Sequence, residues 1–332
     1  MTDTMNKSKN NDMRTALVTG ANSGIGFEAS YQLAEVGYSK VILACRTLEK
    51  GETARKLLID RGCKDVFETL AVDVSEVESA MRASEELLSK NYTIDLLILN
   101  AGMSSGNKIT KNSNGVDLTF ASTLIGHHVL TMNLLNKKGI NENGRIIIAG
   151  SEAARGGLPG IKLPDLDAVS KTEFNGNMYN TLKSYALAEY PAKYVPMNAY
   201  ALAKLMVAWW TASLSKRLPD GITVNAVSPG SVISTSFARD QSWALRNIMM
   251  PLMKVMGPMM GMAGTVAAAG KRYLDVSNYG NEVSGKFFGS PPKKLVGKLE
   301  EQRTPLLQDE SKWDETYKLI VDLTGGLDYQ KN

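Results

Sequence analysis

The chain has 332 residues, of which 43% are hydrophobic and 22% charged, and its formal net charge is +4. This is ordinary globular composition, and the small charge without a dense Lys/Arg run argues against a nucleic-acid partner. The only two cysteines, Cys45 and Cys63, exclude a disulfide framework and favour a reducing compartment, which we take to be the cytoplasm. Neither they nor the two histidines have metal-ligand spacing, so no metal site is expected.

Residues 1–13 are polar and contain no apolar core segment, so we expect a disordered tail rather than a signal peptide. No apolar run reaches the length of about 18 residues that a membrane span requires. Residues 14–332 contain no repeat or convincing linker and are expected to form a single domain.

The first structured segment is an apolar strand, Thr15 to Thr19, which runs into a glycine-rich turn. An amphipathic helix at 27–36 and a buried strand at 41–45 follow, which completes a βαβ unit. The glycines fall as T-G-x-x-x-G-x-G, with Gly20, Gly24 and Gly26. Glycine lets the backbone approach a pyrophosphate, whose charge is stabilised at the helix N-terminus. This turn therefore predicts nucleotide binding.

The same alternation continues along the chain. Strands are predicted at 66–72, 94–99, 145–150 and 222–227, and helices at 76–90, 116–135 and around residue 200. Strands that alternate with helices indicate an α/β fold, a Rossmann-type doubly wound parallel sheet of about seven strands with helices on both faces. Ligands of such folds bind past the carboxyl ends of the strands.

Tyr200 and Lys204 lie four residues apart on a predicted helix and therefore on one face of it. A phenol with its ordinary pKa near 10 is a poor acid-base catalyst at neutral pH. A nearby ammonium group is expected to pull that pKa toward the working range. The pair predicts proton transfer to or from an alcohol oxygen.

These features together carry a family resemblance over roughly residues 15–326. The matching motifs are Thr19–Gly26, Asp73-Val74, Asn100-Ala101-Gly102, Ser151, Tyr200-x-x-x-Lys204 and Pro229-Gly230. They occur in the order of the short-chain dehydrogenase/reductase family, which the chain resembles. It is most similar to the retinol dehydrogenase and protochlorophyllide reductase branch, on segment 44–51, on 285–288 and on 319–327.

The resemblance implies a role for each motif. Tyr200 would be the general acid or base, Lys204 would lower its pKa and hold the nicotinamide ribose, and Ser151 would hydrogen-bond the substrate oxygen. Hydride would pass directly between nicotinamide and carbon. The implied cofactor-binding residues are Gly20, Asn22, Ser23, Gly24, Ile25, Gly26, Arg46, Asp73, Val74, Asn100, Ala101, Gly102, Tyr200, Lys204, Pro229, Gly230 and Val232.

Arg46 indicates which cofactor is used. An acidic residue at the end of the second strand would bind a ribose 2′-hydroxyl, as in NAD enzymes. Here the strand ends Ala44-Cys45-Arg46, with no acidic residue before Glu49. A guanidinium suits a 2′-phosphate, so NADP(H) is favoured. The alternative is that Arg46 is a solvated loop charge.

Two features depart from the family pattern. The family usually has an asparagine, thought to hold a proton-relaying water, where this chain has Thr123; a shift of one residue would offer Ser122 instead. In addition, Ser151 and Tyr200 lie 49 positions apart, which leaves an insertion at 155–197. The insertion is expected to shape the substrate pocket, or else to cover the helix surface through which many relatives dimerise.

Segment 236–265 is rich in methionine, which adapts to irregular apolar surfaces. We expect it to be a lid over a bulky apolar substrate, with Met249 and Met253 as substrate contacts beside Ser151. Helix packing and a membrane-touching helix are the alternatives. The Trp209-Trp210 pair is expected in the core or an interface, and His127-His128 in helix packing and at the surface.

The sequence thus predicts an NADP(H)-dependent oxidoreductase that reduces a ketone or aldehyde, or oxidises the alcohol, of an apolar small molecule. Two alternatives stay open: reduction of a carbon–carbon double bond, or a non-catalytic NADP-binding sensor or scaffold. The sequence leaves undecided whether the protein is a monomer or a homodimer.

Overall fold

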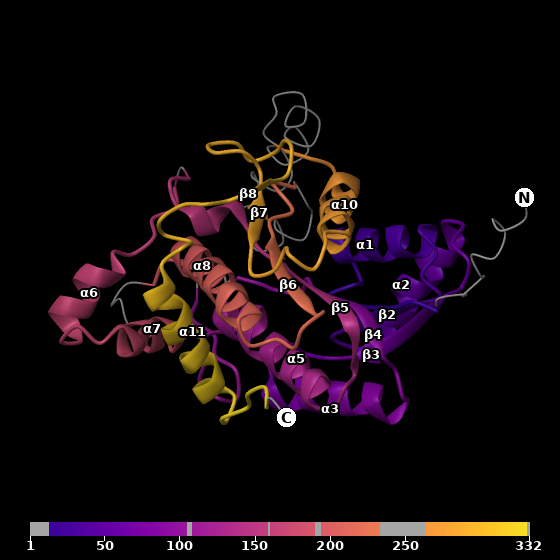
Figure 1. The fold of residues 1–332 in the computed structure, drawn as a ribbon, viewed down its shortest axis with the longest axis horizontal. Helices are drawn as coiled ribbons and strands as arrows, with labels where there is room; N and C mark the ends of the chain where they lie inside the picture. The colour runs from indigo at the N-terminus through magenta and orange to yellow at the C-terminus, as the bar shows by residue number, and fades with distance from the viewer. Residues whose placement is uncertain (1–12, 105–107, 159, 190–193, 233–262, 331–332) are drawn as a thin grey trace, which may run out of the picture.

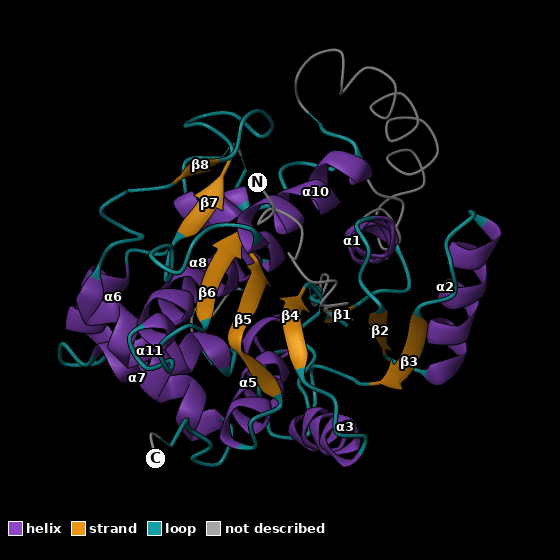
Figure 2. Ribbon diagram, turned by 45° about the vertical axis from the view of Figure 1, so that its right-hand side comes forward, coloured by secondary structure: helices purple, strands orange, loops and turns teal. Residues whose placement is uncertain are grey.

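The computed structural model describes residues 13–104, 108–158, 160–189, 194–232 and 263–330. Its centre is one sheet with the strand order β3-β2-β1-β4-β5-β6-β7-β8 (Figure 2). The strands are β1 Thr15–Thr19, β2 Lys40–Cys45, β3 Phe67–Ala71, β4 Ile94–Leu99, β5 Ile140–Ala149, β6 Thr223–Val227, β7 Phe287–Gly289 and β8 Glu300–Glu301. All neighbouring strands pair in parallel except β7 and β8. The Rossmann-type parallel sheet is therefore confirmed, with one short antiparallel strand added at its edge.

Helices cover both faces of this sheet (Figure 1). They are α1 Gly24–Glu35, α2 Leu48–Asp60, α3 Val77–Ser89, α4 Leu118–Phe120, α5 Gly126–Asn136, α6 Leu166–Glu173, α7 Met178–Ala186, α8 Pro196–Ser215, α10 Val266–Ser277 and α11 Glu310–Leu323. Alternate residues of a strand point to opposite faces. On β1, Leu17 joins the core beneath α3, α5 and α8, while its neighbours Ala16 and Val18 join the core beneath α1, α2 and α10. Both faces are apolar because both are covered.

The predicted elements are present, with differences in their bounds and number. The first helix starts at Gly24 rather than 27, because the glycine turn itself forms its first turn. Strand β5 begins at Ile140, five residues early, with a register irregularity opposite β4. Observed elements without a predicted counterpart are α2, α6, α10, α11, β7 and β8. The predicted long helix at 116–135 is interrupted by a turn of π-helix at Ala121–Ile125. Such turns often mark functional sites.

Helix α5 approaches the end of β3 with no room for a side chain. A Cβ on Gly126 would lie 2.2 Å from the carbonyl oxygen of Val74. The backbone of α5 therefore contacts the backbone at Val74. This contact fixes how closely the first residue of α5, directly after the π-turn, packs against the segment that follows β3.

The outer faces of α5 and α8 are covered by the C-terminal part of the chain (Figure 1). Trp209 donates to the carbonyl of Leu306, and His128 Nε2 lies 2.8 Å from the carbonyl oxygen of Leu327. Both Trp209 and Trp210 are fully buried, which places the pair in the core. Helix α7 of the insertion also packs against α11.

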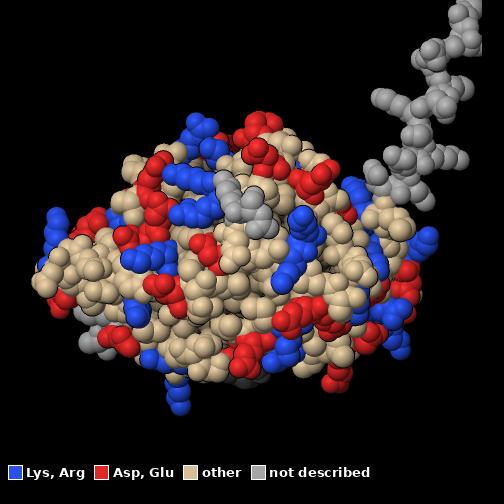
Figure 3. Space-filling view, turned by 60° about the horizontal axis from the view of Figure 1, so that its bottom comes forward, with Lys and Arg blue, Asp and Glu red and all other residues tan. Residues whose placement is uncertain are grey.

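Acidic and basic side chains alternate over the face of the molecule shown in Figure 3, and neither sign forms a continuous patch there. Among the described residues, no helix has the length and apolar content needed to span a bilayer.

The contact at Gly126 gives a first prediction. Gly126→Ala should destabilise the fold by about 1–3 kcal/mol, because the added methyl group overlaps backbone that cannot move like a side chain. Gly264→Ala is the control, since its Cβ would meet atoms only at 3.6 Å and 3.8 Å. Denaturant unfolding of both variants measures the difference, and equal losses would contradict the steric argument.

Candidate functional site

The turn between β1 and α1 depends on its glycines. Gly20 and Gly24 have φ angles of +68° and +59°, a region that favours glycine. A Cβ on Gly26 would lie 2.5 Å from the carbonyl oxygen of Gly20 and 2.6 Å from the side-chain nitrogen of Asn100. The spacing T-G-x-x-x-G-x-G is therefore required by the packing of this turn against the end of β4.

The N-terminus of α1 suits an anion. Its N-cap, Ser23, makes no side-chain hydrogen bond to the first turn, and that turn contains no acidic residue. By contrast, Thr47 and Thr265 cap α2 and α10 with their side chains. A Cβ on Gly24 would meet nothing within 4 Å, so the turn is open beside the helix. Free N–H groups and the helix dipole fit a dinucleotide pyrophosphate.

Arg46 lies past the end of β2 and makes an ion pair. Its Nε is 3.3 Å from a carboxylate oxygen of Asp73, and its side chain is 56% exposed. The other carboxylate oxygen of Asp73 accepts from the backbone and the hydroxyl of Ser75. No acidic residue adjoins Arg46 in the sequence. Its carboxylate partner is instead Asp73, which follows the end of β3. The guanidinium is oriented but still open to solvent.

Asn100, Ala101 and Gly102 follow β4 and are bound to β1. The Asn100 side chain donates to the carbonyl of Thr19, and the backbone N–H of Ala101 donates to the Thr19 hydroxyl, each at 3.0 Å. Tyr273 of α10 donates to the Asn100 side-chain oxygen from the other side, at 3.3 Å. Asn100 is therefore held by its side chain rather than free to contact a ligand through it.

Ser151 follows β5, and Tyr200 lies in the second turn of α8. The Ser151 hydroxyl lies near the phenol of Tyr200 and accepts from the backbone N–H of Ala153. Burial raises the pKa of Tyr200 above its ordinary value, and the neighbouring Ser151 hydroxyl lowers it by less. The expected lowering by Lys204 does not prevail in the cofactor-free protein, where the lysine Nζ lies 5.8 Å from the tyrosine ring centre. Tyr200 therefore carries its proton at neutral pH.

Lys204 is 5% exposed, and its Nζ donates to the carbonyl of Ala149 at 2.7 Å. Burial lowers the pKa of Lys204 to about 8. The same side chain is close to the end of β4, because a Cβ on Gly102 would lie 3.7 Å from its Nζ. Helix α8 thus brings a buried amine between the ends of β4 and β5.

Ser151 is followed by a buried carboxylate with two arginines. Glu152 pairs with Arg155 at 2.9 Å and with Arg272 at 3.8 Å, and it accepts from the backbone N–H of Ser290. Arg272 also donates to the carbonyl of Ser228, immediately before Pro229 and Gly230. This cluster joins the ends of β5, β6 and β7, so it fixes the segments that carry Ser151 and Pro229-Gly230.

Thr123 and Ser122 face different neighbours. Ser122 accepts from the backbone N–H of Met103 and donates to the carbonyl of Leu118. The Thr123 hydroxyl is buried without a hydrogen-bond partner, and a Cβ on Gly102 would lie 3.6 Å from it. Thr123, not Ser122, therefore lies next to the space beside Lys204.

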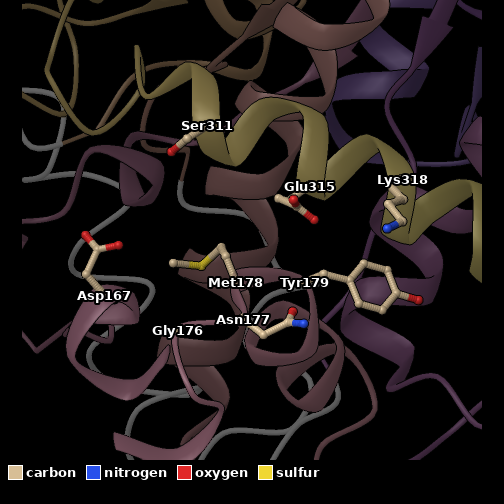
Figure 4. Close-up of a pocket in the computed structure, with 8 residues that line it drawn as sticks. All are labelled: Asp167, Gly176, Asn177, Met178, Tyr179, Ser311, Glu315 and Lys318. Carbon is tan, nitrogen blue, oxygen red and sulfur yellow. The ribbon is translucent and has the colours of Figure 1, made fainter. Parts of the chain in front are cut away.

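The insertion at 155–197 is divided between two places. Its first part lies beside the start of α8, where the backbone N–H of Lys162 donates to the side chain of Asn198. Helix α7 packs against α6 and α11, and the three helices line an open cavity of about 510 Å³ that shares no lining residue with the predicted site (Figure 4). Met249 and Met253, with most of the 236–265 segment, lie outside the described residues. The flanks of that segment meet in a parallel bridge between Val232 and Gly264.

Three residues at the site had no role assigned from the sequence: Thr19, His127 and Tyr273. The Thr19 hydroxyl lies 3.0 Å from His127 Nε2, and Tyr273 supports Asn100. His127 and His128 were expected as helix packing and surface residues, whereas both are buried and hydrogen-bonded. The signal for Thr19 was its fixed place before Gly20, whereas no local pattern distinguishes His127 or Tyr273 from core residues.

Known proteins resemble this chain in sequence and in fold. A short chain dehydrogenase family model matches residues 14–163. Retinol dehydrogenase 13 of Homo sapiens is 30% identical over 290 residues, which cover 85% of this chain and 77% of that protein. WW domain-containing oxidoreductase of Gallus gallus is 31% identical over 228 residues, 68% of this chain but 51% of that protein, so the match spans about half of its length.

A solved structure of an actinorhodin polyketide ketoreductase variant with NADPH shares the fold, with a TM-score of 0.61 and 22% identity over 83% of this chain and 95% of that one. The fold and the matches define the class as an oxidoreductase with a nicotinamide cofactor. The chain belongs to the short-chain dehydrogenase/reductase family, in its retinol dehydrogenase-like branch.

The burial of Lys204 gives a second prediction. Between about pH 8 and its ordinary pKa of 10.5, the unfolded chain holds the lysine proton that the folded chain has lost, so stability of the wild type rises with pH there. At pH 7 the charged amine is a cost to folding. Lys204→Met should stabilise the cofactor-free protein by about 2 kcal/mol at pH 7, after loss of one hydrogen bond.

The stabilisation of Lys204→Met relative to the wild type should disappear between pH 8 and pH 10. Denaturant unfolding of both proteins at pH 7 and pH 10 measures it. A stabilisation that is the same at both pH values would show that the amine is not charged in its buried place.

Proposed function

We propose that the protein is an NADP(H)-dependent oxidoreductase that interconverts a ketone or aldehyde with its alcohol on a bulky apolar small molecule. The observation that carries the proposal is the joint position of Ser151, Tyr200 and Lys204 at the strand ends. They lie past the same edge of the sheet as the open glycine turn. Bound cofactor would supply or accept hydride at the substrate carbon.

The protein's own groups account for the proton. In reduction, the Ser151 hydroxyl holds the substrate oxygen and Tyr200 donates its proton to that oxygen as negative charge develops. The raised pKa of Tyr200 keeps the phenol protonated beforehand. The positive charge of Lys204 stabilises the phenolate that remains, and its hydrogen bond to Ala149 keeps it in place.

Arg46 supports NADP(H) over NAD(H). Its guanidinium is exposed at the end of β2, where a cofactor's 2′ substituent is expected, and Asp73 orients it without burying it. A partly exposed guanidinium held in one place suits bidentate contact with a phosphate.

The proposed substrate class rests on the relatives and on the methionine-rich segment. Retinol in the name of the human relative is a bulky apolar alcohol, and polyketides are large ketones. Cys45 and Cys63 are free thiols, consistent with the reducing cytoplasm that we propose. Reduction of a carbon–carbon double bond remains the alternative with the same residues. A non-catalytic sensor is favoured only by Thr123.

Tyr200→Phe tests the catalytic assignment. Loss of the phenolic proton should lower kcat/KM by roughly a factor of 10³, the range of general acid catalysis, while the NADPH Kd changes by less than about threefold. Turnover is followed by the absorbance of NADPH with a panel of apolar ketones, aldehydes and enones. Tyr179→Phe on α7, where the hydroxyl donates to Asp322, is the matched control and should keep full activity. Unchanged turnover in Tyr200→Phe would refute the assignment.

Arg46→Ala tests the cofactor. The NADPH Kd should rise roughly 10- to 100-fold, the value of a charge-assisted contact, and the NADH Kd less than about threefold. Arg55→Ala on α2, which removes an exposed arginine paired with Asp65, controls for net charge. Equal effects of Arg46→Ala on both cofactors would contradict the charge argument.

A further inference from the structure

The ring of His127 connects two parts of the site. It is 1% exposed, on the side of α5 that faces the sheet. Its Nε2 lies 3.0 Å from the Thr19 hydroxyl, and its Nδ1 lies 3.2 Å from the carbonyl oxygen of Thr123. Both ring nitrogens therefore have a partner, one at the start of the glycine turn and one inside the π-turn.

The partners allow one assignment of the hydrogens. The Thr123 carbonyl can only accept, so Nδ1 of His127 carries the hydrogen. In the neutral ring Nε2 then accepts, and the Thr19 hydroxyl donates to it at 3.0 Å, a closer acceptor than the carbonyl oxygen of Ile98 at 3.5 Å. The same hydroxyl accepts from the backbone N–H of Ala101 at 3.0 Å. The result is one directed chain from Ala101 through Thr19 and His127 to Thr123.

The ring stays neutral in this chain. Burial, and then the nearby charge of Lys204, lower the pKa of His127 to about 3. At neutral pH it therefore neither gives nor takes a proton in the reaction. Its contribution is geometric, a rigid ring with one fixed donor and one fixed acceptor.

Each end of the chain positions a different part of the site. At one end, Thr19 also accepts from the side chain of Asn100 through its carbonyl, so it sets the place of the Asn100-Ala101 segment. At the other end, the Thr123 hydroxyl and Lys204 Nζ lie 3.6 Å and 3.7 Å from a single point, the Cβ position of Gly102. The hydroxyl lacks a partner there, although it is buried.

A π-helical turn is unusual and persists where its surroundings hold it. Directly after this turn, Gly126 packs on the backbone of Val74. Within the turn, the carbonyl of Thr123 accepts from Nδ1 of His127. Two contacts therefore support the segment that carries the Thr123 hydroxyl.

We propose that His127 is a positioning residue with two separable effects: through Thr19 it orders the cofactor-binding end of β4, and through Thr123 it orders the surroundings of Lys204. The proposal rests on the oxidoreductase function proposed above. The two effects predict that loss of one hydrogen bond weakens cofactor binding and that loss of the other slows turnover.

Two variants separate these bonds. The asparagine amide reaches the position of Nδ1 and the glutamine amide that of Nε2. His127→Asn thus keeps the bond to Thr123 and loses that to Thr19, whereas His127→Gln does the reverse. His128→Gln is the matched control, because His128 is also fully buried but its Nε2 faces Leu327, away from the site. All three are compared by thermal unfolding, by NADPH Kd from fluorescence titration, and by kcat at saturating NADPH.

We expect His127→Asn to raise the NADPH Kd about tenfold with kcat within about threefold, as for loss of one hydrogen bond in binding. His127→Gln should lower kcat about tenfold with the Kd within about threefold. His128→Gln should lower the Tm comparably but leave both constants within about twofold.

The inference is overturned if both His127 variants change Kd and kcat by the same factor. It is also overturned if the changes in Kd and kcat of all three variants are proportional to their loss of Tm. If the wild type binds NADPH and turns over substrate but the two His127 variants do not show this split, the role of His127 is refuted and the proposed reaction is not. Wild-type protein that binds NADPH without turnover refutes the proposed reaction, while the Kd of His127→Asn still decides the Thr19 effect. Wild-type protein that does not bind NADPH refutes both.

Discussion

The site depends on one contact, the closure of β1 against the end of β4. The Asn100 amide and the Ala101 N–H both bind Thr19, and they fit only because Gly26 has no side chain. This closure places the first turn of α1 beside the end of β4. Every other site residue is positioned relative to that edge: Ser151 by the next strand along, Lys204 by a helix packed behind both.

A second constraint is the cost of buried charge. Lys204, Arg155 and Arg272 all lie in the interior near the strand ends, with Glu152 as the carboxylate that pairs with both arginines. Unpaired buried charges are unfavourable, and carbonyl groups can compensate only in part. Positive charge at these strand ends therefore lowers the stability of the fold, and in the proposed reaction the charge of Lys204 would stabilise the Tyr200 phenolate.

The sequence predicted the sheet well because its signal is local. The apolar run at 94–99 became β4 without a change of boundary, and the glycine turn followed from steric rules that act within a few residues. The contacts that complete the site are not local. Arg46 forms an ion pair with Asp73, which follows the neighbouring strand β3, and the Tyr273 hydroxyl of α10 donates a hydrogen bond to Asn100. A buried histidine such as His127 has the same sequence signature whether it packs or forms hydrogen bonds, so only its neighbours in space reveal its role.

The packing of α11 has a consequence for the order in which the protein is made. Helix α8, with Trp209 and Trp210, is synthesised long before α11, whose Leu319 and Ile320 belong to the same core. Until α11 leaves the ribosome, the outer faces of α5 and α8 remain an uncovered apolar surface, the kind of surface that chaperones bind and that promotes aggregation. The nascent chain can therefore build the first βαβ unit early, but it cannot finish the core around α8 until α11 has been made.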